Sequence, residues 1–286
     1  MQIDAAPIID WIVENWIIFA VIGGVIVVGI IVLMLLPAAK VKDSPDFPAD
    51  TPEANDLAIG LIQIRNADGA WNDPLGTDLA KDTERKAVLV EMWGLTSHDE
   101  WVATIDRLVH DRRRRPLWQS LIQIRADLIK STGVVPSRSA WLKGIKAAGG
   151  TGKGDERSVV DAVGYYEDEF RKMTSKDVFP KSSAVTNLDG YALNQAAAVA
   201  VWGVALGLAT PEESRARLRE ISDIARSEFA SWGDFGRSVV VGRAMHWSDG
   251  QMVEKQAKMG QDYAHDFERA MNPKLNGPWS RLAWRR

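Results

Sequence analysis

Residues 207–221, GLATPEESRARLREI, contain the pattern that best indicates how this chain folds. A glycine is followed by a hydroxyl residue, an early carboxylate and then apolar residues at helical spacing. Thr210 and Glu213 have the spacing of a capping box, in which each side chain satisfies a backbone N–H at the start of a helix. Gly207 stands where the preceding helix is expected to end in a left-handed cap. The stretch therefore predicts a helix, a glycine turn and a capped helix.

Residues 94–108, GLTSHDEWVATIDRL, repeat this pattern. Ser97 and Glu100 have the capping-box spacing, and Gly94 takes the place of Gly207. The similarity has two interpretations. One is an internal duplication, and the other is coincidence, because the signals that begin and end helices are stereotyped.

Helical spacing and cap signals also cover the rest of the chain beyond residue 50. Thr51-Pro52-Glu53 offers an N-cap, a proline at the first helical position and an early carboxylate. Convincing alternating strands are lacking, and the best candidate, 238–241, has neighbours that suit a helix better. The predicted fold class is therefore all-α. Besides the helix that begins near Pro52, the predicted helices are 78–93, 98–110, 116–131, 137–147, 157–172, 187–206, 211–230, 232–245 and 251–270.

The composition excludes several classes of protein. The 286 residues are 46% hydrophobic and 26% charged, with no cysteine and a formal net charge of −3. Disorder, a disulfide scaffold and thiolate metal centres are therefore excluded. Beyond residue 36 basic and acidic residues balance, so no attraction to nucleic acid is expected.

Residues 17–36 form a run of 20 uncharged, mostly apolar residues. As a helix this run would be about 30 Å long, which matches the hydrocarbon core of a bilayer. The alternative is a cleaved signal peptide. Signal peptides, however, have a basic segment before a shorter apolar core, and no lysine or arginine precedes this run. The run therefore predicts a retained transmembrane helix in contact with membrane lipid.

The basic residues near this run predict its orientation. None precedes it, whereas Lys40 and Lys42 follow it, so the larger part of the chain is expected in the cytoplasm. Three prolines and three aspartates within 43–52, DSPDFPADTP, indicate an extended linker. The expected organisation is a short outer N-terminus (1–16), a transmembrane helix (17–36), a linker (37–52), a compact multi-helix domain (53–270) and a basic aromatic tail (271–286).

Between residues 187 and 247 the chain has a Trp-Gly pair, an acidic helix start, Ser-Trp, an aromatic residue, Gly-Arg and a closing tryptophan. This succession resembles the bacterial DUF1266 family over about residues 85–250. The resemblance implies a helical domain and supplies no activity, because the family's function is unknown. The apolar stretch 196–201 departs from the polar helix of the family pattern. The matching residues are Trp202, Gly203, Glu212, Glu213, Ser231, Trp232, Phe235, Gly242, Arg243 and Trp247.

The densest charge cluster consists of Arg112, Arg113, Arg114 and Arg115. Four guanidinium groups can bind phosphates, anionic headgroups or an acidic partner. If the segment were helical, Arg113 and Arg114 would face away from the other two. The alternative interpretation is a solvated turn between helices that ends at Pro116.

Other candidate motifs indicate no chemistry. The loop 149–154, GGTGKG, lacks the first glycine and the final hydroxyl residue of a P-loop, so nucleotide binding is not expected. The acidic residues 167–169 are interpreted as a solvated helix face. No cofactor or metal is predicted, because the four histidines lack metal-ligand spacing. They are His98, His110, His246 and His265.

The C-terminal tail mixes indoles with arginines, namely Trp279, Arg281, Trp284, Arg285 and Arg286. This mixture suits a bilayer interface or a groove on a partner. Docking of the tail on its own domain is the other interpretation.

The leading functional hypothesis is a single-pass, membrane-anchored helical interaction module. It would be an accessory subunit or scaffold that binds a protein or lipid partner at the cytoplasmic membrane face without catalysis. The competing hypothesis is an enzyme with a cleft formed by Asp189, Arg243, His246 and Asp249.

Overall fold

The computed structural model describes residues 40–285. The predicted transmembrane helix, 17–36, and the predicted outer N-terminus lie outside the described residues. Within 40–285, no helix combines the length and the apolar character that crossing a bilayer requires.

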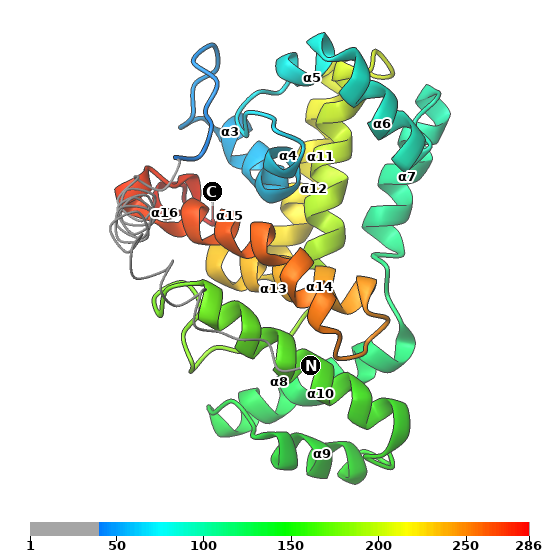
Figure 1. Ribbon diagram of the computed structural model, residues 1–286, viewed down its shortest axis with the longest axis vertical. Helices are drawn as coiled ribbons and strands as arrows, with labels where there is room; N and C mark the ends of the chain where they lie inside the picture. The colour runs from blue at the N-terminus through cyan, green and yellow to red at the C-terminus, as the bar shows by residue number, and fades with distance from the viewer. Residues whose placement is uncertain (1–39, 286) are drawn as a thin grey trace, which may run out of the picture. The chain divides into compact units, whose positions relative to one another are not determined.

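The described residues form helices joined by turns and short loops, without a β-strand (Figure 1). The all-α prediction is confirmed for this part of the chain. The α-helices are α3 (Pro52–Leu57), α4 (Leu61–Asn66), α5 (Thr77–Lys81), α6 (Thr83–Trp93), α7 (His98–His110), α8 (Pro116–Thr132), α9 (Arg138–Ala147), α10 (Gly154–Met173), α11 (Gly190–Ala205), α12 (Pro211–Glu228), α13 (Trp232–Trp247), α14 (Glu254–Met259), α15 (Gln261–Met271) and α16 (Pro278–Arg281). Two 3₁₀ turns, η1 (Ala58–Gly60) and η2 (Pro273–Leu275), complete the order.

Helix α11 lies at the centre of the domain. It packs against α4, α7, α12, α13 and η1, and nearly all of its residues are buried. A helix that is apolar on every side is stable in water only when other elements cover it. The alanines of 196–198 let those elements approach closely, and the Trp101 indole of α7 donates to the Val199 carbonyl at 2.9 Å.

The two predicted capped helices are α7 and α12, and both pack against α11. Thr210 and Glu213 form the predicted reciprocal capping box of α12. At α7, Ser97 accepts from the Glu100 N–H, but the Glu100 carboxylate accepts from the Thr96 N–H instead of that of Ser97. The first copy is therefore a variant of the box.

The glycine turns before α7 and α12 are also as predicted. Gly94 and Gly207 have φ angles of +66° and +73°, a left-handed conformation that glycine adopts without a steric penalty. The two helix starts meet, because the His98 ring lies 3.3 Å from the Glu213 carboxylate. Both copies thus share a left-handed glycine turn followed by a helix with a side-chain N-cap, and the internal duplication stays a prediction.

Helices α8, α9 and α10 pack together at one end of the described domain, at the bottom of the view in Figure 1. Arg125 of α8 and Glu167 of α10 form a bidentate ion pair with both distances 2.8 Å, and both side chains are buried. The Glu167 carboxylate also accepts from the Val185 N–H at 2.6 Å, and Arg125 donates to the Val185 carbonyl at 3.1 Å. This ion pair therefore ties α8, α10 and the segment before α11 together.

The prediction that residues 167–169 form a solvated face is wrong for Glu167. Asp168 is exposed, as expected, but Glu167 faces the interior because its charge pairs with the buried Arg125.

The C-terminal tail packs on its own domain. Trp279 stacks on Trp232 with ring centroids 5.2 Å apart, and Trp284 meets the same ring edge-on at 4.8 Å. Their indole N–H groups donate to the carbonyls of Ala58 and Phe229, at 2.9 and 2.7 Å. Since both indoles are buried, the expectation that they face a bilayer or a partner is corrected.

The described part of the predicted linker also contacts the domain. The Asn72 side chain bonds the backbone of Ser44 and Phe47, and Trp71 donates to the Asp43 carboxylate. This stretch is therefore not a free spacer, because residues 71–72 supply its missing hydrogen bonds.

Candidate functional site

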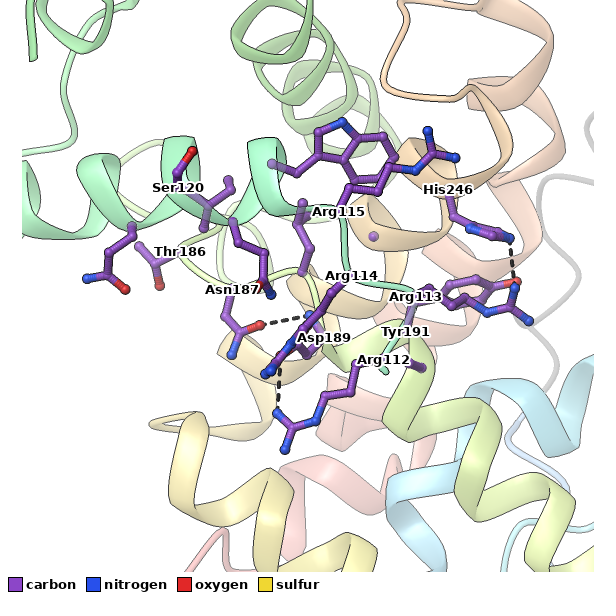
Figure 2. Close-up of a pocket in the computed structure, with 17 residues that line it drawn as sticks. Arg112, Arg113, Arg114, Arg115, Ser120, Thr186, Asn187, Asp189, Tyr191 and His246 are labelled. Carbon is purple, nitrogen blue, oxygen red and sulfur yellow. Dashed lines mark hydrogen bonds and ion pairs between the residues drawn. The ribbon is translucent and has the colours of Figure 1, made fainter. Parts of the chain in front are cut away.

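A pocket of about 430 Å³ opens where α8 and α11 begin and α13 ends. Its walls come from the turn between α7 and α8, the segment before α11, and the three helices themselves. Figure 2 shows the four arginines of the turn together with residues of α8, α11 and α13. The lining residues are Arg112, Arg113, Arg114, Arg115, Trp118, Gln119, Ser120, Ile122, Gln123, Thr186, Asn187, Leu188, Asp189, Tyr191, Ala192, Gly242 and His246.

The arginine turn has an uncommon backbone. Arg112 and Arg113 have φ angles of +49° and +54°, a left-handed conformation that costs a residue with a side chain on the order of 1 kcal/mol. Because the segment is a turn and not a helix, all four arginines reach the same pocket. Strain of this kind is concentrated at functional sites.

Asp189 fixes two of the four arginines. Its buried carboxylate accepts from Arg114 Nε at 3.0 Å and from Arg112 Nη1 at 3.1 Å. This pairing raises the pKa of Arg114. Arg112 also pairs with Glu228 and donates to the Val109 carbonyl, so it caps the last turn of α7. Both side chains are therefore held rigidly.

Arg115 has a carboxylate partner as well. It pairs with Asp249, and both groups are substantially exposed. Its guanidinium also lies over the ring of Trp118, 4.6 Å from the centroid. Exposure makes this ion pair weaker than the one around Asp189.

Arg113 differs from the other three, because none of the described carboxylates pairs with it. Its Nε donates to the Gln195 side-chain oxygen at 2.8 Å, and its Nη1 lies 2.9 Å from His246 Nε2. Burial lowers the pKa of this guanidinium, although an arginine stays charged in proteins. The pocket thus contains a largely buried positive charge that its neighbours hydrogen-bond but do not neutralise.

His246 is neutral at physiological pH. Burial, together with the charges of Arg113, Arg115 and Arg243, lowers its pKa to about 4. Because arginine can only donate, His246 Nε2 accepts the bond from Arg113 and the ring proton lies on Nδ1. Burial also raises the pKa of Tyr191, whose ring lies 5.8 Å from the Arg113 guanidinium.

Two helices begin at this pocket. The N-caps of α8 and α11 are Arg115 and Asp189, and neither makes a side-chain capping bond. The N-terminal ends of helices carry a partial positive charge. The backbone therefore adds to the positive potential of the arginines.

The four residues of the hypothetical catalytic cleft do not all meet. Asp189 and His246 line the pocket, whereas Asp249 is exposed and is not among the lining residues. Arg243 lies over the Tyr263 ring, 4.7 Å from its centroid, and is not among the lining residues. The structure brings two of the four into one cavity.

The DUF1266-like residues mainly form the scaffold around the pocket. Trp202, Trp232 and Phe235 are buried, and Ser231 caps α13. The remaining motif residues have different surroundings. Gly203 packs against Trp101, Gly242 lines the pocket, and the exposed Trp247 donates to the Tyr191 hydroxyl.

A glycine is required at position 242. A Cβ atom there would lie 2.7 Å from the Leu188 carbonyl oxygen. Because Gly242 has no Cβ atom, α13 can approach the segment that carries Thr186 and Asp189.

The other sequence candidates lie outside the pocket. Arg281 and Arg285 are exposed, and Arg286 lies outside the described residues. In the loop 149–154 the Glu156 carboxylate accepts from the N–H groups of Thr151 and Gly152, and so fills the place that a phosphate would need. No group of side chains within 40–285 has the arrangement of a metal site.

Several residues of the site were not predicted. Thr186 and Gln119, which line the pocket, belong to no motif. Gln195, which accepts from Arg113 behind the lining, interrupts an apolar stretch of α11. A polar residue within an otherwise apolar helix is a usable signal, because burial requires it to have a partner.

The fold and the pocket define an all-helical protein with an arginine-lined cavity. The chain belongs to the DUF1266 family, described as a protein of unknown function, whose family model matches residues 88–284. The match includes every lining residue of the pocket and extends beyond the predicted 85–250 into the tail, whose indoles belong to the core. No curated protein and no solved structure matches the chain.

Proposed function

We propose that this protein is a membrane-anchored binding module whose arginine pocket takes up an anionic group of its partner without catalysing a reaction. The main support for this proposal is the environment of Arg113. Arg113 lines the pocket, its guanidinium is largely buried, and it has no carboxylate partner among the described residues. A buried charge without a counter-charge is costly, and an anion bound beside it removes much of that cost.

The charges around the pocket also favour an anion. Four arginines line it, against three carboxylates that pair with them, Asp189, Glu228 and Asp249. The N-terminal ends of α8 and α11 add positive potential. Guanidinium groups suit phosphates and carboxylates because their N–H groups form a planar fork.

Binding is favoured over catalysis because the two candidate proton carriers are occupied. The Asp189 carboxylate accepts from two arginines, and the Nε2 lone pair of His246 accepts from Arg113. A general base needs a lone pair directed at the substrate. The enzyme hypothesis would require these contacts to rearrange when the substrate binds.

Replacing Arg113 with glutamine tests the proposal. We expect the full-length chain in detergent to bind inorganic phosphate or pyrophosphate in titration calorimetry, and R113Q to weaken binding about tenfold or more, because a charge-assisted bond is lost. Arg138→Gln is the matched control, since Arg138 pairs with Asp161 on α9 and α10, outside the pocket. Failure of the wild-type chain to bind either anion would contradict the proposal, as would equal affinities of R113Q and R138Q.

The membrane anchor is a separate part of the proposal. It is supported by the uncharged run 17–36 and by the lysines that follow it, which favour a cytoplasmic domain. We expect the full-length chain to stay in the membrane pellet after a carbonate wash, and a chain without residues 1–39 to be released. Recovery of the full-length chain in the supernatant would remove the anchor from the proposal.

A further inference from the structure

The pocket has two chemically different ends. Figure 2 shows Arg113, Tyr191 and His246 on one side and Ser120 and Thr186 on the other, with Arg114 and Asp189 between them. The first side contains the arginine without a carboxylate partner. The second side is uncharged and carries hydroxyl and amide groups.

The uncharged end has unused hydrogen-bonding capacity. The side chains of Gln119 and Thr186 make no hydrogen bond with any residue of 40–285. Gln123 donates its amide N–H to Asp127, which leaves its oxygen as an acceptor, and Ser120 donates to the Leu117 carbonyl, which leaves its lone pairs. Donors and acceptors are therefore both present, as hydroxyl groups of a ligand require.

The remaining lining contains apolar patches, supplied by Ile122, Leu188 and Ala192. These patches are too few and too interrupted by amides for an acyl chain, which offers no hydrogen bonds to the polar groups beside it. A sugar or cyclitol ring presents C–H faces, which suit the apolar patches, and hydroxyl groups, which suit the polar side chains. A volume of about 430 Å³ falls within the range of small-molecule sites.

The charged end suits a phosphate better than a carboxylate. Arg112, Arg114 and Arg115 already pair with carboxylates, namely Asp189, which lines the pocket, and Glu228 and Asp249, which lie outside its lining. At this end Arg113 remains, beside the ring of Tyr191. A tetrahedral dianion can accept from several directions at once, whereas a carboxylate accepts mainly in one plane.

We propose that the anion bound in this pocket is the phosphate group of a small phosphorylated polyol. The phosphate lies at Arg113, and the hydroxyl groups of the ligand lie at Thr186 and Gln119. This inference rests on the proposed anion-binding function. The chemistry is shared by soluble sugar phosphates and by the headgroups of phosphorylated inositol lipids.

Titration of the full-length chain in detergent micelles tests the inference. The probes are inorganic phosphate, glucose 6-phosphate, inositol 1-phosphate, neutral glucose and glucuronate, which carries a carboxylate in place of the phosphate. We expect at least one phosphorylated polyol to bind about tenfold tighter than inorganic phosphate, and glucose not to bind. Two or more added hydrogen bonds to hydroxyl groups account for this factor.

Two variants test the two ends of the pocket independently. Arg113→Gln should weaken every phosphate probe, whereas Thr186→Val, which keeps the shape of the side chain, should weaken only the phosphorylated polyols, by about two- to tenfold. Arg138→Gln should change none of the affinities. Unchanged melting temperatures of the variants show that they fold.

The outcomes distinguish this inference from the proposed function. If inorganic phosphate binds in an Arg113-dependent way but the polyol phosphates bind no tighter, or if T186V leaves their advantage intact, the polyol site is wrong and anion binding stands. Tighter binding of glucuronate than of glucose 6-phosphate would also overturn the polyol phosphate site. If no phosphate probe binds, both the polyol phosphate site and the proposed anion-binding function are wrong. Adding phosphatidylinositol 4-phosphate to the detergent micelles, with phosphatidylcholine as the control lipid, tells a lipid headgroup from a soluble ligand. A headgroup site predicts that only the phosphorylated lipid competes with the soluble polyol phosphate, and a site for a soluble ligand predicts that neither lipid competes.

Discussion

Glutamine in place of Glu167 is expected to lower the free energy of unfolding by about 3–5 kcal/mol. The carboxylate of Glu167 is the counter-charge of Arg125, and both side chains are almost fully buried. Glutamine keeps the size of the side chain but leaves the Arg125 charge uncompensated in the interior. Urea unfolding of the full-length chain in detergent, followed by tryptophan fluorescence, measures the loss.

A neighbouring residue supplies the control. Asp168→Asn removes a carboxylate from an exposed pair with Arg171, so its expected effect is about 1 kcal/mol or less. The double variant R125M/E167L should recover part of the loss, because it leaves no buried charge behind. If E167Q is no less stable than D168N, the ion pair does not hold this end of the domain together.

The same variant should also affect the pocket. Val185 donates to Glu167 and accepts from Arg125, and it directly precedes Thr186 of the uncharged end. With Glu167 uncharged, Arg125 loses the ion pair that holds it in place, so both bonds to Val185 weaken and the segment that carries Thr186 and Asp189 is less firmly held. We therefore expect E167Q to weaken ligand binding at temperatures where the chain is still folded.

Alanine in place of Trp279 is expected to cost about 3–5 kcal/mol of stability, the usual loss for a large buried aromatic side chain. The indole is 3% exposed, stacks on Trp232, and donates to the Ala58 carbonyl. It therefore links the C-terminal tail to η1, near the beginning of the described domain. Thermal unfolding of the full-length chain in detergent measures the effect.

Trp247→Ala is the matched control for Trp279. Trp247 is 56% exposed at the end of α13, so its replacement is expected to cost about 1 kcal/mol or less. A small effect of W279A, combined with weaker membrane binding, would restore the hypothesis that the tail indoles contact a bilayer.

Local signals allowed the helices to be predicted closely. The expected helix 98–110 coincides with α7, and 116–131 ends one residue before α8 does. Capping residues, prolines at the first helical position and left-handed glycines act within a few residues, so they can be read from the chain directly. The predicted 78–93 is divided into α5 and α6 because Asp82 caps a new helix start.

Long-range pairing could not be predicted in the same way. Glu167 was interpreted as solvated because its neighbours are acidic, and only contact with Arg125 of α8 shows why it is buried. The tail indoles have the composition of a membrane contact, yet their rings fit against Trp232. The burial of Glu167 and of the tail indoles depends on which surfaces pack together, and a local sequence pattern does not contain that information.

In the candidate site too, some features follow from local sequence and others only from packing. From the amino-acid sequence, the predicted helices 98–110 and 116–131 leave the four adjacent arginines between them, and Asp189 and His246 belong to the four residues of the enzyme hypothesis. Only the tertiary contacts show that these groups share one cavity, that Asp189 pairs with two arginines, and that Arg113 has no carboxylate partner within 40–285. The reason is physical: helix starts and ends depend on bonds between near neighbours in the chain, whereas the charge state and accessibility of a pocket depend on groups that only packing brings together.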